Sequence, residues 1–450
     1  MNSGISDAVE LTALLHERLP QIQKALPGLH ESWIRVMRNS ALDSFFRQGV
    51  PTTRHEDWKY TDIKKFSARL AVSATEKTAN DISVETLSEF YFGSLDCHRV
   101  VIVDGFVSSE LSSLKALPAG VRVESMARML AEEAHLLESY LHDQHLSGSL
   151  AELNTAMMYD GVYIDIPDGI VIEQPIHLLF ISHQRSEDSS HIRNLIVAGE
   201  YSQVTVIEHF ASLDGSRALI NAATDVELHA GARLEHYKLQ QSDINEVNIG
   251  SIRAHQHRDS YYHSHSVAFG AALSRRDIHV EMNGEGAECA LNGLYLVGGR
   301  QHVDHHTRID HVRPHCRSRE SYKGVIDGRA RAVFNGKVVV HKGADQTDSA
   351  QSNANLLLSD KAEVDTKPDL EIHADDVKCA HGATVGQLDM NQLFYLKSRG
   401  LSEEDARNVL MFAFADEVLA EIKLPEVRRY LERVAFEKLP NVAGLEGMLG

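Results

Sequence analysis

The sequence predicts a mainly β protein in which a parallel β-helix, a solenoid of stacked coils, lies between two helical regions. Across residues 154–384, short runs of β-forming residues alternate with Gly, Asn and Asp turns, and no long helical pattern interrupts them. Turn segments such as residues 229–233 and 284–288 recur on a period of roughly 20 to 25 residues, which is typical of a solenoid. We therefore expect roughly ten coils. A sandwich of this length would exceed the usual size of one domain.

Residues 1–150 form the first region, which we expect to be mainly helical. Apolar residues recur at helical spacing before Pro20, where the first helix is predicted to end. A second helix is predicted to end at Gly49, and a third to span residues 125–145. Residues 99–105 instead predict a buried strand that meets an Asp-Gly turn.

The segment PTTRHEDWKYTDI, residues 51–63, combines mixed charge with two aromatic side chains, Trp58 and Tyr60. Pro51 and the two threonines after it mark a loop. Two interpretations stay open for this segment. It is either a partly exposed docking segment or a loop that its aromatic side chains pack against the body of the protein.

The β-helix core is predicted to span residues 151–388, and a helical region residues 389–450. A helix over residues 391–399 would end at Gly400, a residue type favoured after helices. Ser402, with Asp405 three residues later, is placed to cap the next helix, and Pro425 suits the first turn of a last helix. About 50 residues cannot bury this much apolar surface alone. The region therefore either packs on the solenoid or presents a face to a partner.

The composition argues against some partners and compartments. Lysine and arginine number 45 against 64 acidic residues, a formal net charge of −19, which argues against nucleic acid and anionic membranes as partners. No stretch approaches the roughly 20 apolar residues of a membrane-spanning helix, and no secretory signal is recognisable. The four cysteines form no CxxC pair and no disulfide framework. We expect a cytoplasmic protein.

A thiol and an imidazole stand two residues apart at Cys379 and His381, where the β-rich region gives way to helices. In an extended strand both side chains would lie on one face, and sulfur with nitrogen ligands suits iron or zinc. Two side chains are only half of a metal site, so the other ligands would come from elsewhere in the chain or from a partner. The alternative is a small buried thiol beside a surface histidine.

Two further groups stand out among the 26 histidines. Residues 302–316 hold five histidines and Cys316, but alternate side chains of a strand face opposite ways, so they could not all bind one ion. His263 and His265 form an HxH pair like that of cupin metal sites, which need a glutamate a few residues later. The next glutamate is Glu281, which weakens that interpretation. Solvated or cross-strand-paired imidazoles are the simpler interpretation, and we assign no role to residues 302–315.

The motifs of self-sufficient catalysis are missing from the sequence. Asn335-Gly336-Lys337-Val338 lacks the upstream glycine and the Ser or Thr of a P-loop. No GxGxxG opens a helix after a strand, and no GxSxG elbow occurs. We expect no enzymatic activity from this chain.

Three segments together resemble the SufB/SufD family of iron–sulfur cluster assembly scaffolds. They are residues 51–63, the stretch around Cys379 and His381, and LKSRGLSEEDARNVLMFAFADEVL at residues 396–419. The order of helices, β-solenoid and helices is also similar to the family, so the resemblance covers nearly the whole chain. Residues 58–61, Trp-Lys-Tyr-Thr, are closer to the SufD branch.

The resemblance implies a right-handed parallel β-helix in a scaffold subunit that pairs with the paralogue SufB and binds the ATPase SufC. His381, with Cys379 beside it, would face SufB across the heterodimer interface as an iron or cluster ligand. The chain alone would hold no cofactor stably, and iron or an Fe–S cluster would be bound transiently at that interface. The SufC-docking role would fall on the C-terminal helices, at Ser398, Arg399, Gly400, Phe412, Phe414 and Leu419.

Two alternatives stay open. Carbohydrate-active enzymes such as polysaccharide lyases form similar β-helices, although only 6% of the residues here are aromatic and no sugar groove is obvious. The other alternative is a SufB-like scaffold that forms a homodimer.

Overall fold

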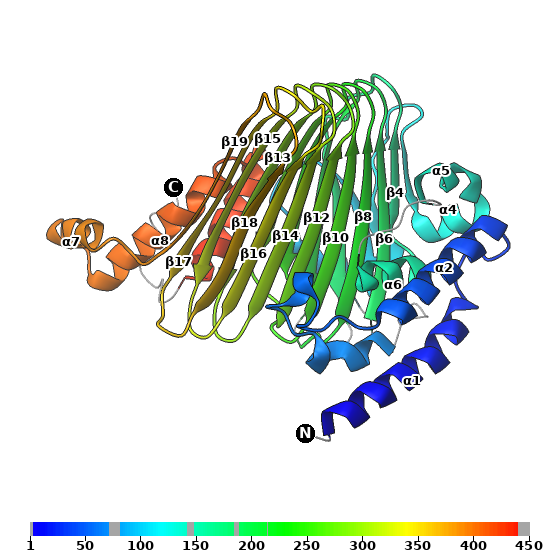
Figure 1. The fold of residues 1–450 in the computed structure, drawn as a ribbon, viewed down its shortest axis with the longest axis horizontal. Coiled ribbons are helices and arrows are strands. Elements are labelled where there is room, and N and C mark those ends of the chain that lie inside the picture. Colours follow the sequence, from blue (N-terminus) through cyan, green and yellow to red (C-terminus); the bar gives the residue numbers. More distant parts are fainter. Residues whose placement is uncertain (1–2, 72–81, 142–147, 184–188, 214, 440–450) are drawn as a thin grey trace.

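The protein is a flattened β-solenoid of about eight turns, flanked by helices at both ends of the chain (Figure 1). The computed structural model describes residues 3–71, 82–141, 148–183, 189–213 and 215–439. Each coil contributes one strand to each of two facing sheets, which we call the odd sheet and the even sheet after the numbers of their parallel strands. The prediction of a mainly β solenoid with helical flanks is confirmed.

The ten strands of the odd sheet lie side by side in the order β19 (Lys378–Gly386), β17 (Asp348–Leu357), β15 (Arg317–Ile326), β13 (Glu288–Val297), β11 (Tyr261–Ala268), β9 (Arg233–Gln241), β7 (Gln203–Ser212), β5 (Ile176–Ser182), β1 (His98–Val103) and β2 (Phe106–Ser113). The nine strands of the even sheet are ordered β18 (Glu363–Ile372), β16 (Arg331–Val340), β14 (His302–His311), β12 (Leu273–Met282), β10 (Val247–Gln256), β8 (Leu219–Leu228), β6 (Ser189–Ala198), β4 (Val162–Ile166) and β3 (Arg122–Ser125).

The coils are longer than the sequence suggested. Val247 pairs with Leu273 and Arg331 with Glu363, so one coil takes 26 to 32 residues. The predicted period of roughly 20 to 25 residues was therefore too short, and the predicted number of coils too high. The reason is that several coils carry two strands of 10 residues each, such as β12 and β13, besides their two turns.

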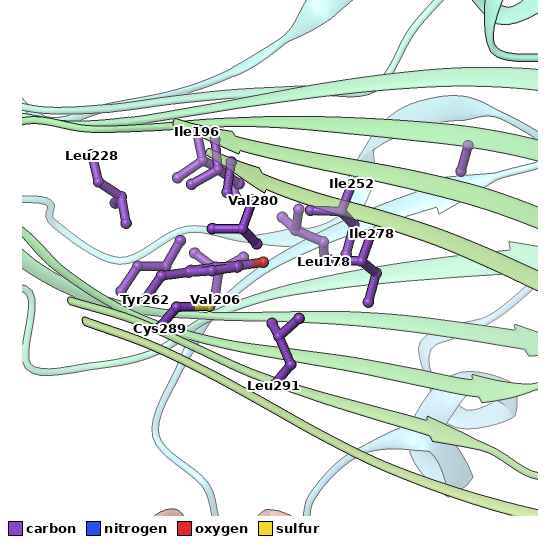
Figure 2. Packing of buried hydrophobic residues seen from close by; sticks show 14 of the residues in the cluster. Leu178, Ile196, Val206, Leu228, Ile252, Tyr262, Ile278, Val280, Cys289 and Leu291 are labelled. Atoms are coloured by element: carbon purple, nitrogen blue, oxygen red, sulfur yellow. The ribbon is translucent and has the colours of Figure 1, made fainter. Parts of the chain in front are cut away.

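The core lies between the two sheets. Strand side chains alternate between the inside and the outside of the solenoid, and the inward ones form one continuous apolar cluster. Figure 2 shows part of it, with Val280 and Ile278 of the even sheet near Tyr262 and Leu291 of the odd sheet. Burying these side chains stabilises the fold by about 25 cal/mol per Å² of apolar surface.

One ion pair is buried in the same interior. Glu208 on β7 pairs directly with Lys238 on β9, and both side chains are completely buried. Thr224 Oγ1 donates a further hydrogen bond of 2.5 Å to Glu208 Oε1. A buried charge needs such partners because its separation from water is costly.

The N-terminal helices cover the first coils. They are α1 (Ser3–Gln23), α2 (Ser32–Gln48), α3 (Val84–Leu87), α4 (Met126–Glu132), α5 (Glu138–Leu141) and α6 (Ser149–Met157), with short 3-10 segments at Glu56–Trp58, Lys64–Ala71, Ser88–Phe90 and Ala134–Leu136. Strands β1, β2 and β3 also lie within residues 1–150, so this part of the chain contributes to both sheets.

Two predicted helix boundaries were wrong. Helix α1 continues through Pro20 to Gln23, because a proline in a last turn removes only one hydrogen bond while Leu19 and Gln23 on either side of it stay buried. The helix predicted over residues 125–145 is broken after α4, where Glu133 leaves the helical conformation with φ −133°. Residues 142–145 of that prediction lie outside the described part of the chain. Helix α2 does end before Gly49, as predicted.

Residues 51–63 form a loop packed against the even sheet. The Trp58 side chain is buried, and Thr61 Oγ1 donates a 2.5 Å hydrogen bond to Asp304 Oδ2 on β14. The interpretation of a loop held by its aromatic side chain is therefore correct for Trp58, while Tyr60 is half-buried.

The C-terminal region contains α7 (Met390–Ser398), α8 (Glu403–Leu419) and α9 (Pro425–Glu437). As predicted, Ser402 caps α8 by accepting a 3.0 Å hydrogen bond from the Asp405 backbone N–H, and Pro425 begins α9. Helices α8 and α9 pack on the outer face of the odd sheet, whereas α7 projects away from the solenoid (Figure 1). None of the described helices is long and apolar enough to cross a membrane.

The two ends of the solenoid differ. At the first coils, the outermost strands β2 and β3 run antiparallel to their neighbours. At the other end, β18 and β19 each have a strand neighbour on one side only within the described residues. Their free edges are exposed, and so are many of their side chains.

Candidate functional site

Cys379 and His381 lie on β19, the last strand of the odd sheet. The strand is extended, as predicted, and places Cys379 beside Ser349 and His381 beside Gln351 of β17. Ser349 and Gln351 are buried in the solenoid, so both candidate ligands are on its inward-facing side. Because no further coil covers this end within the described residues, His381 is nevertheless exposed and Cys379 is half-buried.

A column of polar side chains runs from His381 through the interior of the solenoid toward the earlier coils. The Gln351 side-chain amide donates a 2.5 Å hydrogen bond to Glu320 Oε2 on β15. Burial raises the pKa of Glu320 to about 7, although hydrogen bonds with Thr307 and Gln351 oppose the rise. Gln351, the ladder neighbour of His381, is thus hydrogen-bonded to a carboxyl group whose pKa is near neutral.

A second column continues inward from Cys379. Ser349 accepts a 2.8 Å hydrogen bond from Ser318, and Ser318 pairs with Cys289 on the next strand. Burial raises the pKa of the Cys289 thiol far above its usual value and also raises the pKa of the Cys379 thiol. A metal ion would have to displace the thiol proton of Cys379 to bind there.

The described residues supply only part of a metal site at this end. No group of three potential ligands there includes Cys379 or His381 within the described ranges. Any ion held by this pair would need ligands from outside the described residues, and the exposed free edge of β19 is where another chain can reach them.

The predicted docking residues differ in their solvent exposure. Ser398, the last residue of α7, and the turn residues Arg399 and Gly400 are exposed. Phe412 and Phe414 are half-buried at the edge of the helix–sheet cluster, with the Lys323 amino group 4.4 Å from the Phe414 ring centre. Leu419 is completely buried. Because Leu419 is on the sheet-facing side of α8, its side chain is not available to a partner.

Helix α7 exposes apolar side chains that the sequence patterns did not single out. Met390, Phe394 and Tyr395 are 68%, 74% and 56% exposed. Met390 and Phe394, four residues apart, lie on the same side of the helix, and Tyr395 directly follows Phe394. The adjacent aromatic residues Phe394 and Tyr395 were the available signal in the sequence, but only the structure shows that both are exposed, with the Arg399 guanidinium 5.2 Å from the Tyr395 ring centre.

The histidine-rich stretch occupies β14, and its side chains alternate as predicted. His302 and His306 face outward near the packed loop. His305 faces inward, where it stacks on the Tyr295 ring and also contacts the tilted Tyr322 ring. These histidines therefore do not converge on one point.

Comparisons with known proteins agree with this architecture. Residues 180–414 match the SufBD core domain of the SUF system for FeS cluster assembly, and residues 15–178 match the SufBD protein N-terminal region. This chain belongs to the SufBD family. The predicted resemblance is confirmed, and the chain is a SufBD family iron–sulfur cluster assembly protein.

Relatives with similar length support the SufBD assignment. An iron–sulfur cluster assembly SufBD family protein of Synechocystis is 32% identical over 91% of this chain and 92% of its own. The iron–sulfur cluster assembly protein SufD of Escherichia coli is 33% identical over 89% and 92%. The SufD protein of Bacillus subtilis is 24% identical over 91% and 94%. The SufBD assignment favours iron–sulfur cluster assembly over the carbohydrate-active alternative.

Proposed function

We propose that this SufBD family chain is a non-enzymatic, cytoplasmic scaffold subunit. It pairs with a SufB-type paralogue through β18 and β19 and binds a SufC-type ATPase through its C-terminal helices. The observation that carries the proposal is the position of His381 and Cys379 on the last strand, facing the inside of a solenoid whose end is open. They contribute ligands to iron or a nascent cluster, and the paralogue contributes the others. Iron enters the complex at this junction.

The backbone of β19 supports pairing with another strand. Lys378 N–H donates to Thr347 O at 2.8 Å, toward β17. Because backbone N–H groups alternate in direction along a strand, those of Cys379, His381 and Ala383 point to the free edge. Such an edge is a template for strand addition.

A backbone substitution at the free edge tests the pairing. Ala383→Pro removes one outward N–H without removing a hydrogen bond to β17. We expect it to reduce co-purification with the co-expressed SufB-type subunit, whereas Ala383→Ser, which keeps the N–H, retains it. Equal recovery of the paralogue with both variants would refute pairing through this edge. Self-pairing through the same edge would instead appear as a dimer mass for the isolated parent chain that Ala383→Pro abolishes.

A second experiment tests the ligand role. In the assembled complex, His381→Ala is expected to lower iron and sulfide content while leaving subunit pairing intact. His373→Ala is the matched control, because His373 is also exposed at this end and pairs with Glu371, at 2.9 Å, on the neighbouring sheet. Unchanged iron content in His381→Ala would remove His381 from the site.

The proposed ATPase-docking surface consists of Met390, Phe394 and Tyr395 with the neighbouring turn Ser398, Arg399 and Gly400. Exposed aromatic side chains at this density are typical binding anchors. Phe394→Glu is expected to abolish capture of the SufC-type ATPase. Val36→Glu is the control, because Val36 is also exposed, at 61%, but lies on α2. Normal capture by Phe394→Glu would contradict docking on α7.

A further inference from the structure

A second potential metal site lies on the outer face of the odd sheet, away from Cys379 and His381. His263 and His265 are two residues apart on β11, so they share the outward face. Glu235 on β9 is the direct ladder partner of His263. The HxH pair lacks a nearby glutamate in the sequence. The neighbouring coil supplies one instead, because Glu235 precedes His263 by 28 residues in the sequence but lies beside it in the sheet.

The ligand atoms of these three residues are already close. All lie within 4.8 Å of one another, and His263 Nδ1 lies 3.0 Å from Glu235 Oε2. Ligand atoms about 2 Å from a metal ion lie about 3 Å apart in tetrahedral or octahedral sites. One pair of ligands thus has the separation of a formed site, and small side-chain rotations bring in the third.

The side chain of His265 gives independent evidence for a bound ion, because its ring nitrogens lack partners among the described residues. Its side chain is completely buried, stacked on Tyr237 with ring centres 5.2 Å apart. Neither ring nitrogen of His265 has a hydrogen-bond partner among the described residues. A buried polar group without a partner is costly, and an ion that binds such a nitrogen removes the cost.

The surroundings orient the other histidine. Asn292, the ladder partner of His265 on β13, places its side-chain amide 3.1 Å from His263 Nε2. Metal-binding histidines donate the N–H of their second ring nitrogen, so an ion on Nδ1 requires the Asn292 amide to accept from Nε2–H through its oxygen. With Nε2 engaged, Nδ1 is the nitrogen turned toward Glu235. Ala290 is the other ladder neighbour of His263.

We propose that Glu235, His263 and His265 bind one divalent first-row transition-metal ion, such as Zn²⁺ or Fe²⁺. Two histidines and one carboxylate with open positions are a common ligand set for these ions. The inference does not depend on the role of Cys379 and His381.

The site also contacts the C-terminal region. Lys423, in the link between α8 and α9, forms an ion pair with Glu235 Oε1, and its backbone N–H donates to the Tyr237 hydroxyl at 3.2 Å. The Lys423 ammonium competes with a metal ion for the same carboxylate. Metal binding therefore weakens one attachment of the helical region to the sheet.

Co²⁺ titration of the full-length protein tests the proposal. The Cys379→Ser/His381→Ala background removes the other candidate ligands, and visible absorption with calorimetry measures binding. We expect one equivalent to bind, without the sulfur-to-metal charge-transfer band that a thiolate ligand would give. Glu235→Gln and His263→Gln are each expected to weaken binding by about tenfold or more. His257→Gln, an exposed histidine paired with Glu227 at 2.6 Å, leaves it unchanged.

Lys423→Met supplies a test that does not depend on removing a ligand. It is expected to strengthen Co²⁺ binding several-fold, because it removes a positive charge beside Glu235. Circular dichroism checks that each variant is folded. The proposal is overturned by the absence of Co²⁺ binding in the folded background protein, by unchanged affinity in folded Glu235→Gln and His263→Gln, or by weaker binding in folded Lys423→Met.

Discussion

The Arg275 guanidinium on β12 lies 4.1 Å from the centre of the Trp58 ring. Arg275 also donates a 2.8 Å hydrogen bond to the Asp57 carbonyl and a 2.5 Å hydrogen bond to Asp304. One buried side chain thus attaches the N-terminal loop to the even sheet. This contact joins parts of the chain that are distant in sequence, so it contributes only after both have folded.

Trp58→Ala is therefore expected to destabilise the protein. Loss of the buried indole and of its cation–π contact should lower the free energy of unfolding by about 3 to 5 kcal/mol. Denaturant unfolding followed by circular dichroism measures the change. Lys59→Ala, at the exposed neighbouring position, should stay within about 0.5 kcal/mol of the parent. Equal midpoints for the two variants would show that the loop does not contribute to stability.

The interior ion pair predicts strong coupling between two strands. Glu208→Leu and Lys238→Leu should each cost about 3 to 5 kcal/mol, because each leaves an unpaired buried charge. The double variant should lose much less than the sum of the two. A double-mutant cycle in denaturant gives the interaction energy. Additive losses would mean that the two charges act independently.

Glu320 predicts a pH dependence of stability. Its folded pKa of about 7 lies above the ordinary 4.5, so the folded state holds a proton that the unfolded state releases. Stability from this group is present below about pH 4.5 and is lost as pH rises through about 7, a change of about 3 kcal/mol. Glu320→Gln should remove this loss, so the gap in melting temperature between variant and parent should grow from pH 5 to pH 8. A constant gap would contradict the prediction.

The exposed aromatic of α7 should not contribute to folding. Phe394 is 74% exposed and Phe436 on α9 only 7%. Phe394→Ser is expected to change the free energy of unfolding by less than about 0.5 kcal/mol, whereas Phe436→Ser should cost about 3 kcal/mol or more. Chemical denaturation compares the two. A large loss in Phe394→Ser would show that α7 is packed in solution and is not available for docking.

Local sequence signals predicted local structure well. The Ser402 cap, Pro425 at the start of α9 and the end of α2 before Gly49 each depend on a few neighbouring residues. The extended conformation around Cys379 and His381 follows in the same way from strand alternation. The coil length was harder to predict from the sequence, because turns of different length let 26 to 32 residues complete one coil.

Sites formed between coils could not be predicted from spacing. Glu235 meets His263 only through strand register, so a search for a nearby glutamate in sequence led to Glu281. The burial of Leu419 and the exposure of Phe394 depend on which side of a helix meets the sheet. Nothing in the C-terminal sequence alone distinguishes a residue that packs on the protein's own sheet from one that awaits a partner.

The unlike ends of the solenoid limit how such chains can assemble. Strand addition at the free edges of β18 and β19 places two solenoids end to end, but the antiparallel strands β2 and β3 at the far ends do not repeat that edge. Among the described strands, such a pair leaves no second end of this kind exposed, so growth stops at two subunits rather than continuing into a filament. The difference between the two ends of the solenoid therefore limits assembly through β18 and β19 to a pair of subunits.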